Sequence, residues 1–312
     1  MIHRNEGFTL IELSIVLVII GLIVGGVLVG QDLIKAAYVR EQISQIEKYN
    51  TAVNTFYGKY QALPGDMNNS VATAFGFAAR GPNGGEGDGN GIIQTDNANQ
   101  PYGAATYGAP GIVGESGRFW VDLTTANGLN LNLIDGGFSS AIIDGCINGC
   151  AGDVMAASVG QYFPAAKIGN GNYVYVWSGG WFTVDFSTPG DGKNYFGISV
   201  VTRISEYGSV SAINAGLTVK QAYDIDRKVD DGYPQSGNVT AQGLMIDGAM
   251  AWADYAGGYP AISPPWTTPT PGSTTTCFDN GNANGAVQQY TMEIGGGNAA
   301  NCTLAFKMQA GD

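Results

Sequence analysis

Few residues of this chain are of the types that perform chemistry, and their positions argue against catalysis. The single histidine among 312 residues is His3. A Ser-His-Asp triad, a His-ligated zinc or an imidazole proton shuttle would therefore depend on the extreme N-terminus. Aspartates and glutamates are more numerous, but no pair stands at a spacing that singles out the two carboxylates of a glycosidase. The sequence predicts a protein that is not an enzyme.

Four cysteines form two close pairs, Cys146 with Cys150 and Cys277 with Cys302. No second Cys-x-x-Cys or Cys-x-x-His accompanies them, so zinc is disfavoured. An even count behind an apolar N-terminal segment favours disulfides in an oxidising compartment, with reduced buried thiols as the alternative. Three pairings are open, and proximity favours the two named above. Closing the interval between Cys277 and Cys302 would contribute roughly 3 kcal/mol of stability.

Four aspartates lie close together in the second half of the chain: Asp224, Asp226, Asp230 and Asp231. Clustered carboxylates suit calcium, but the pattern departs from a calcium-loop template at its fifth and sixth positions. A solvated acidic helix end is the favoured interpretation. Residues 280–285 echo such a loop with neutral ligands and place Thr291 where a glutamate is needed. No metal and no other cofactor is predicted.

The N-terminal segment is a long apolar run. Over residues 8–30 the only polar side chains are Thr9, Glu12 and Ser14. As a helix these 23 positions span roughly 34 Å, enough for a bilayer core. A secretory signal peptide has a shorter apolar core followed by a small-residue cleavage site. Here the run continues into a second helical pattern, which favours an anchor over a cleaved signal.

Glu12 is the unusual residue of this run. An ionised carboxylate at such a position costs about 2.5–3.5 kcal/mol on insertion scales, so it requires a partner. If the chain is cut between Gly7 and Phe8, the new α-amino group of a neighbouring copy is a cation at matching depth. We therefore expect Glu12 to pair with the Phe8 terminus of another subunit.

Residues 7–13 (GFTLIEL) resemble the prepilin leader junction of type IV pilins and type II secretion pseudopilins. The resemblance includes the short polar leader with Arg4, the glycine before the cut and the glutamate at the fifth mature position. It implies that a prepilin peptidase cleaves after Gly7 and that Phe8 is N-methylated. It also implies that Glu12 aligns an incoming subunit with the filament. The alternative is a signal-anchored surface protein with a chance glutamate.

Beyond the apolar run, a stripe at spacings of mostly three or four predicts that the helix continues. Its members are Ile34, Tyr38, Ile46, Tyr49, Val53, Phe56, Tyr57 and Tyr60. Polar residues occupy the intervening positions: Arg40, Gln42, Gln45 and Lys48. Pro64 and Gly65 end the run. One helix of roughly 50 residues is expected, half in the membrane or filament core and half packed on a head.

The remainder reads as a loop-rich head. The glycine-rich residues 81–91 predict a surface loop, and no Gly-Lys-Ser/Thr follows to make it a phosphate loop. Aromatic spacing in residues 118–133 predicts a core helix. Three strands are expected, at residues 173–177, 181–186 and 195–204, with a tight turn at 178–180. A short helix begins at Thr218, where Thr-x-x-Gln forms a capping box, and ends at Asp231 and Gly232.

Composition agrees with an extracytoplasmic head. Only 13% of residues are charged, 48 are glycine, and the net charge is −12. An acidic surface without a basic run disfavours nucleic acid as a partner. Residues 60–66 and 217–237 also resemble a recurrent pattern in large prepilin-type proteins, which implies no defined role.

The predicted fold class is α+β, a pilin fold with a long N-terminal helix and a head containing an antiparallel sheet. The expected division is a leader at 1–7, a helix at 8–62 with 8–30 as its membrane or filament-core part, and a head at 63–312. The expected function is a structural subunit of a type IV pilus-like filament. Alternatives are a minor pilin or tip adhesin with a Tyr/Trp-rich, surface-binding head, and a type II secretion pseudopilin. The expected partners are the prepilin peptidase, related pilin subunits and the inner membrane. The precursor would be a single-pass protein with its head in the periplasm, and the assembled form a surface filament.

Overall fold

The computed structural model describes most of the helices and strands of the chain. The described residues are 9–80, 87–95, 108, 110–124, 133–139, 154–179, 191–204, 210–211, 215–244, 250–253, 276–279, 287–293 and 295–310. The helices are α1 (Leu10–Tyr60), α2 (Asn69–Ala74), α3 (Gly114–Thr124) and α4 (Val219–Val229), with 3-10 turns η2 (Ala156–Gln161) and η3 (Gly295–Gly297). The strands are β1 (Val154–Met155), β2 (Asn172–Ser178), β3 (Asn194–Val200), β4 (Arg203–Ile204), β5 (Val210–Ser211), β6 (Val239–Thr240), β7 (Gln242–Leu244), β8 (Met250–Trp252), β9 (Phe278–Asp279), β10 (Gln289–Tyr290) and β11 (Leu304–Lys307).

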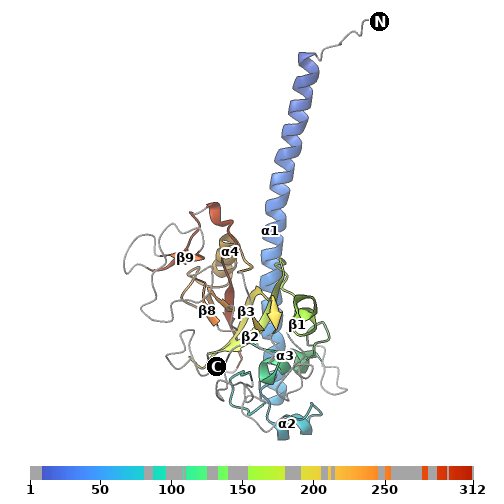
Figure 1. Ribbon diagram of the computed structural model, residues 1–312, viewed down its shortest axis with the longest axis vertical. Coiled ribbons are helices and arrows are strands. Elements are labelled where there is room, and N and C mark those ends of the chain that lie inside the picture. Colours follow the sequence, from blue (N-terminus) through green and yellow to red (C-terminus); the bar gives the residue numbers. More distant parts are fainter. Residues whose placement is uncertain are drawn as a thin grey trace.

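Helix α1 is a single helix of 51 residues. Its upper half projects clear of the rest of the molecule, and its lower half runs through the head between α4 on one side and α3 on the other (Figure 1). The helix ends at Gln61, which adopts a left-handed conformation with φ of 54° and donates its N–H to the Tyr57 carbonyl. Pro64 follows shortly after, because proline cannot continue a helix. The predicted long helix is confirmed.

The main sheet has four antiparallel strands in the order β2-β3-β11-β6. Its residues alternate little in burial, because β2 and β3 are covered on both faces. Strand β11, the last in the chain, lies between β3 and β6 and so joins two earlier segments. The predicted α+β class with an antiparallel sheet is confirmed.

An aromatic cluster joins α1 and α3 to this sheet. Tyr49 of α1 meets Trp120 of α3 at a ring-centroid separation of 5.0 Å, and both rings contact Phe196 of β3. Phe119 and Trp120 are fully buried, as the aromatic spacing of residues 118–133 predicted. Residues 125–132 lie outside the described part of the chain. Burial of rings of this size accounts for a large share of the core energy.

The predicted turn at residues 178–180 was wrong at Ser178. Strand β2 pairs with β3 from Asn172↔Val200 to Ser178↔Asn194. Ser178 is thus a strand residue, and the ladder closes where Gly179 donates to the Lys193 carbonyl. The Ser-Gly-Gly sequence suggested a tight turn, but pairing of buried side chains across β2 and β3 sets the partner. Residues 181–186 lie outside the described part.

Candidate functional site: the N-terminal helix and its head

The first 29 residues of α1, residues 10–38, contain no buried residue. Large apolar side chains in this stretch are openly exposed, among them Leu10 at 89%, Leu22 at 73% and Leu33 at 67%. Such a surface exceeds what a soluble monomer exposes and marks a membrane or protein contact. Within the described residues, α1 is the one helix long and apolar enough to cross a membrane. We call residues 10–38 the bare half of α1.

Glu12 lies at the start of the bare half and caps its own helix. The Thr9 side chain accepts a hydrogen bond from the Glu12 N–H, and the Glu12 carboxylate accepts from the Thr9 N–H at 2.9 Å and from its hydroxyl at 2.8 Å. This capping box satisfies two backbone donors that the first turn leaves unpaired. The sequence contains the signal for it, Thr-x-x-Glu, although only a partner on another chain was predicted for Glu12. Gly7 and Phe8 lie outside the described residues.

The turn after α1 is held by buried charge. Gly65 donates its N–H to the Asp122 carboxylate at 2.7 Å, and the same oxygen receives Arg80 at 2.6 Å. A side chain at Gly65 would collide with the Glu115 carbonyl, because an added Cβ would lie 2.2 Å from that oxygen, and φ is +85°. Glycine is therefore required between Pro64 and the following aspartate.

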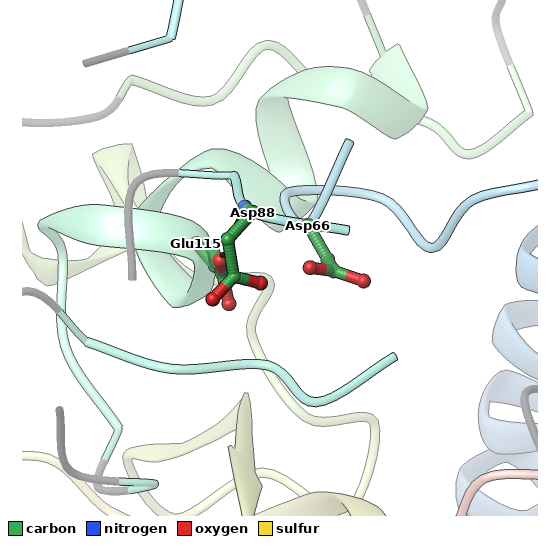
Figure 2. Close-up of side chains that lie close together, drawn as sticks. All are labelled: Asp66, Asp88 and Glu115. Atoms are coloured by element: carbon green, nitrogen blue, oxygen red, sulfur yellow. Dashed lines mark hydrogen bonds between the residues drawn. The ribbon is translucent and has the colours of Figure 1, made fainter. Parts of the chain in front are cut away.

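Three carboxylates from distant parts of the sequence come together beside this turn: Asp66, Asp88 and Glu115 (Figure 2). Their oxygens lie within 4.8 Å of one another, with Asp66 and Glu115 buried and Asp88 exposed. No sequence pattern predicted this cluster, because its members are separated by more than 20 residues. By distance and ligand type the three could hold a hard cation.

The buried oxygens of this cluster, however, already have donors. Asp66 accepts backbone N–H groups of three residues and Glu115 of three more. The donors are Gly89, Asn90 and Gly91 for Asp66, and Gly87, Asp88 and Gln94 for Glu115. The two carboxylates thus hold the loop at residues 87–94 by its backbone, which explains how a glycine-rich segment keeps a fixed path.

Burial changes the protonation of these groups. It raises the pKa of Asp66 to about 7 and raises the pKa of Glu115 well above its usual range. The backbone donors act in the opposite direction, and the neighbouring carboxylates add to the rise. Asp66 therefore takes up a proton near neutral pH, and Glu115 takes one up at a higher pH than an exposed glutamate does.

The aspartates singled out from the sequence lie partly together. Asp226, Asp230 and Asp231 have oxygens within 4.8 Å of one another, while Asp224 pairs with Lys220 at 2.9 Å. The predicted solvated helix end was wrong for Asp226, which is fully buried and accepts a 2.7 Å hydrogen bond from the Tyr290 hydroxyl. Burial raises the pKa of Asp226 to about 7. Helix α4 has its predicted Thr218 capping box.

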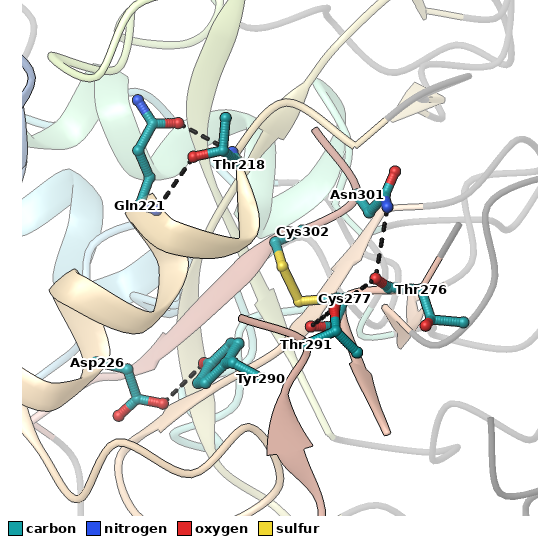
Figure 3. The surroundings of a disulfide bond; sticks show 9 residues. All are labelled: Thr218, Gln221, Asp226, Thr276, Cys277, Tyr290, Thr291, Asn301 and Cys302. Atoms are coloured by element: carbon teal, nitrogen blue, oxygen red, sulfur yellow. Dashed lines mark hydrogen bonds between the residues drawn. A yellow bond between two sulfur atoms is a disulfide. The ribbon is translucent and has the colours of Figure 1, made fainter. Parts of the chain in front are cut away.

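The disulfide between Cys277 and Cys302 is present and fully buried. It ties β9 to the residues just before β11, beside the start of α4 (Figure 3). Asp226 of α4 and Tyr290 of β10 join the same region from the other end of the helix. The predicted pairing of these two cysteines is confirmed. Cys146 and Cys150 lie outside the described residues, and their pairing stays a prediction.

The comparison with family models gives one match. Residues 2–28 match the model of the prokaryotic N-terminal methylation motif. No curated protein and no solved structure matches the chain. The match covers the start of the chain through most of the bare half of α1 and leaves the head without a counterpart.

Proposed function

We propose that this chain, which carries the prepilin-type motif of type IV pilins and pseudopilins, is a structural subunit of a type IV pilus-like filament. Families with this motif are structural rather than catalytic. The subunit is cut after Gly7 by a prepilin peptidase, methylated on the amino group of Phe8, and held in the inner membrane before assembly. Its head then faces the periplasm, and after assembly the surface of the filament.

The observation that carries the proposal is the bare half of α1. A stretch of 29 residues without a buried side chain stands on a folded head. Exposed apolar surface of this extent is stable only in lipid or against other apolar helices. A filament subunit meets both environments in turn: the bilayer before assembly, and the bundled helices of neighbouring subunits after it.

The test is mass spectrometry of filaments sheared from the cell surface, beside the membrane fraction. A dominant peptide beginning at N-methylated Phe8 in the sheared material is the expected result for a major subunit. The same peptide confined to membranes, or present only in traces, would assign a minor pilin or a pseudopilin. An intact Met1 terminus in both fractions would overturn the proposal.

Within this proposal, Glu12 pairs with the α-amino group of Phe8 in the neighbouring subunit. The Glu12→Gln variant separates this role from capping, because glutamine also completes a capping box but carries no charge. We expect normal cleavage and membrane levels and a drop in sheared filaments of roughly tenfold or more, since loss of a buried ion-pair partner costs 2–5 kcal/mol.

Thr9→Val is the matched control, because it removes the hydroxyl of the cap and keeps the carboxylate. Filament yield should stay within about fivefold of the unmodified chain, since a cap contributes about 1 kcal/mol. Normal filaments from Glu12→Gln with few from Thr9→Val would show that Glu12 acts as a cap alone.

A further inference from the structure

The lower half of α1, which packs on the head, has a seven-residue repeat. Val39, Ile46, Val53 and Tyr60 form one buried row at intervals of seven. A second row, also at intervals of seven, consists of Gln42, Tyr49 and Phe56. Gln42 therefore occupies a position equivalent to two buried aromatic residues, and it is itself fully buried. Gln42 and Gln45 were predicted only to lie between the members of the apolar stripe, and the seven-residue repeat is the signal that identifies Gln42 as buried.

A purely apolar repeat does not define its own register. Moving α1 by seven residues, about 10 Å along its axis, would place Ile46 where Val39 lies and Phe56 where Tyr49 lies. Apolar contacts would be largely regained after such a shift, because burial is non-directional. Besides the turn at Gly65, which joins the end of α1 to the head, a unique register comes from groups whose bonds have direction, as a single buried asparagine does in coiled coils.

Three buried amide side chains of α1 make such bonds with the backbone of the head. Gln42 accepts from the Ile168 N–H at 3.0 Å. Gln45 accepts from the Lys167 N–H at 3.0 Å and donates to the Ala165 carbonyl at 2.9 Å. Asn50 accepts from the Gln309 N–H at 3.3 Å, beyond the end of β11. The three side chains thus bind two segments that are far apart in the sequence.

The Gln45 contact has the form of a β ladder. The N–H of one residue and the carbonyl two positions earlier are the pair that a single residue of a parallel neighbour would bind. The other edge of the same segment is already used, because Ala166 donates to the Asn172 carbonyl and Val174 donates to the Pro164 carbonyl. The side-chain amide of Gln45 thus replaces the strand that this edge lacks.

We infer that Gln42, Gln45 and Asn50 form a register lock that fixes the axial position of α1 on the head. A shift by seven residues would bring Ala52 opposite Lys167, where it offers no acceptor, and Tyr49 opposite Ile168, where its one acceptor is the hydroxyl at the far end of the ring. The lock therefore sets how much of α1 stands clear of the head. Any effect of this length on filament assembly rests on the proposed function, whereas the lock itself is a property of one chain.

The experiment measures the distance between α1 and the head in the full chain in detergent micelles. Spin labels are placed at Glu47→Cys and Lys228→Cys, both exposed positions, and pulsed electron resonance gives the distance distribution. The lock predicts one narrow distance for the parent chain. The double variant Gln42→Leu and Gln45→Ala, which completes the apolar repeat, should show a second population from a shift of about 10 Å along the helix axis.

The control is Ser44→Leu, because Ser44 lies between the two glutamines and is exposed; its distribution should match the parent. A folded double variant with the single parental distance would overturn the inference. If the double variant does not fold, hydrogen exchange in the parent decides. Slow exchange of the Lys167 and Ile168 amides, at least about tenfold slower than that of exposed Asn170, supports the lock, and equal rates overturn it. Neither measurement depends on filaments, so a failure of the lock is distinct from a failure of the proposed function.

Discussion

The bare half of α1 and the half that packs in the head belong to one helix, but their side chains are stabilised in opposite ways. From residue 10 to 38 the helix buries nothing, whereas from Val39 onward one face of it is covered by the head. In the head, stability comes from packing, a disulfide and hydrogen-bonded carboxylates within one chain. The bare half has only its own backbone bonds, so its apolar side chains can gain stability solely from lipid or another chain. Fold and assembly are therefore separable properties that substitutions can address one at a time.

The largest effect on the fold is expected at Phe56, which lies in the last turns of α1 within the core. Its ring is fully buried and meets Tyr60 at 4.6 Å and Phe77 at 5.5 Å between centroids. Phe56→Ala should lower the free energy of unfolding by about 3–5 kcal/mol, because it removes apolar burial and leaves a cavity. Denaturant unfolding followed by tryptophan fluorescence measures this change. A loss below about 1 kcal/mol would mean that the head does not depend on α1.

The disulfide has the next largest expected effect. Replacing Cys277 and Cys302 together by serine should cost roughly 3 kcal/mol, because the open chain gains conformational freedom when unfolded. The bond joins residues 25 apart in sequence. Thermal unfolding of the double variant, compared with the oxidised parent, gives the value. An unchanged melting temperature would contradict a stabilising role for the bond. It would mean that the packing of α4 and the sheet holds this region without it.

The protonation of Asp66 should make the head more stable in mild acid. Its folded pKa is raised to about 7 from an ordinary 3.8, so the folded state binds a proton more tightly than the unfolded state. This contribution is complete below the ordinary pKa and is lost as the pH rises through 7. Between pH 8 and pH 5 the gain should be roughly 2.5 kcal/mol, because the pH passes about two units below the folded pKa at about 1.4 kcal/mol per unit.

Asp66→Asn should flatten this pH dependence, because asparagine does not titrate. Asp224→Asn is the matched control, since Asp224 lies on the partly exposed surface of α4 and pairs with Lys220. Glu115 and Asp226 contribute in the same direction, so some dependence should persist in Asp66→Asn. Stability that rises from pH 5 to pH 8 would show that the carboxylates are ionised in the folded head and held by another partner.

The features that were predicted from the sequence depend on local contacts, and those that were missed depend on contacts between distant residues. Helix α1, the Thr218 cap of α4 and the Cys277–Cys302 bond depend on short patterns or on proximity in the chain, and all three were predicted. Asp66 and Glu115 meet through the tertiary fold although they are far apart in the sequence, so no sequence spacing predicts their contact. The pairing of β2 with β3 likewise rests on buried contacts between residues about 20 apart. Burial of Gln42 needed the seven-residue repeat to outweigh the polarity of the residue.

The smallest expected effect is in the bare half and tests the comparison directly. Leu22→Ala removes an apolar side chain of similar volume to those of the core, but Leu22 is 73% exposed. The free energy of unfolding of the head should change by less than about 0.5 kcal/mol, because Leu22 lies in the part of α1 that the head does not bury and alanine is a good helix former. The measurement is denaturant unfolding followed by tryptophan fluorescence, as for Phe56→Ala, with both variants in detergent micelles. A loss comparable to that of Phe56→Ala would mean that the bare half contacts its own head, and the separation of fold from assembly would be wrong.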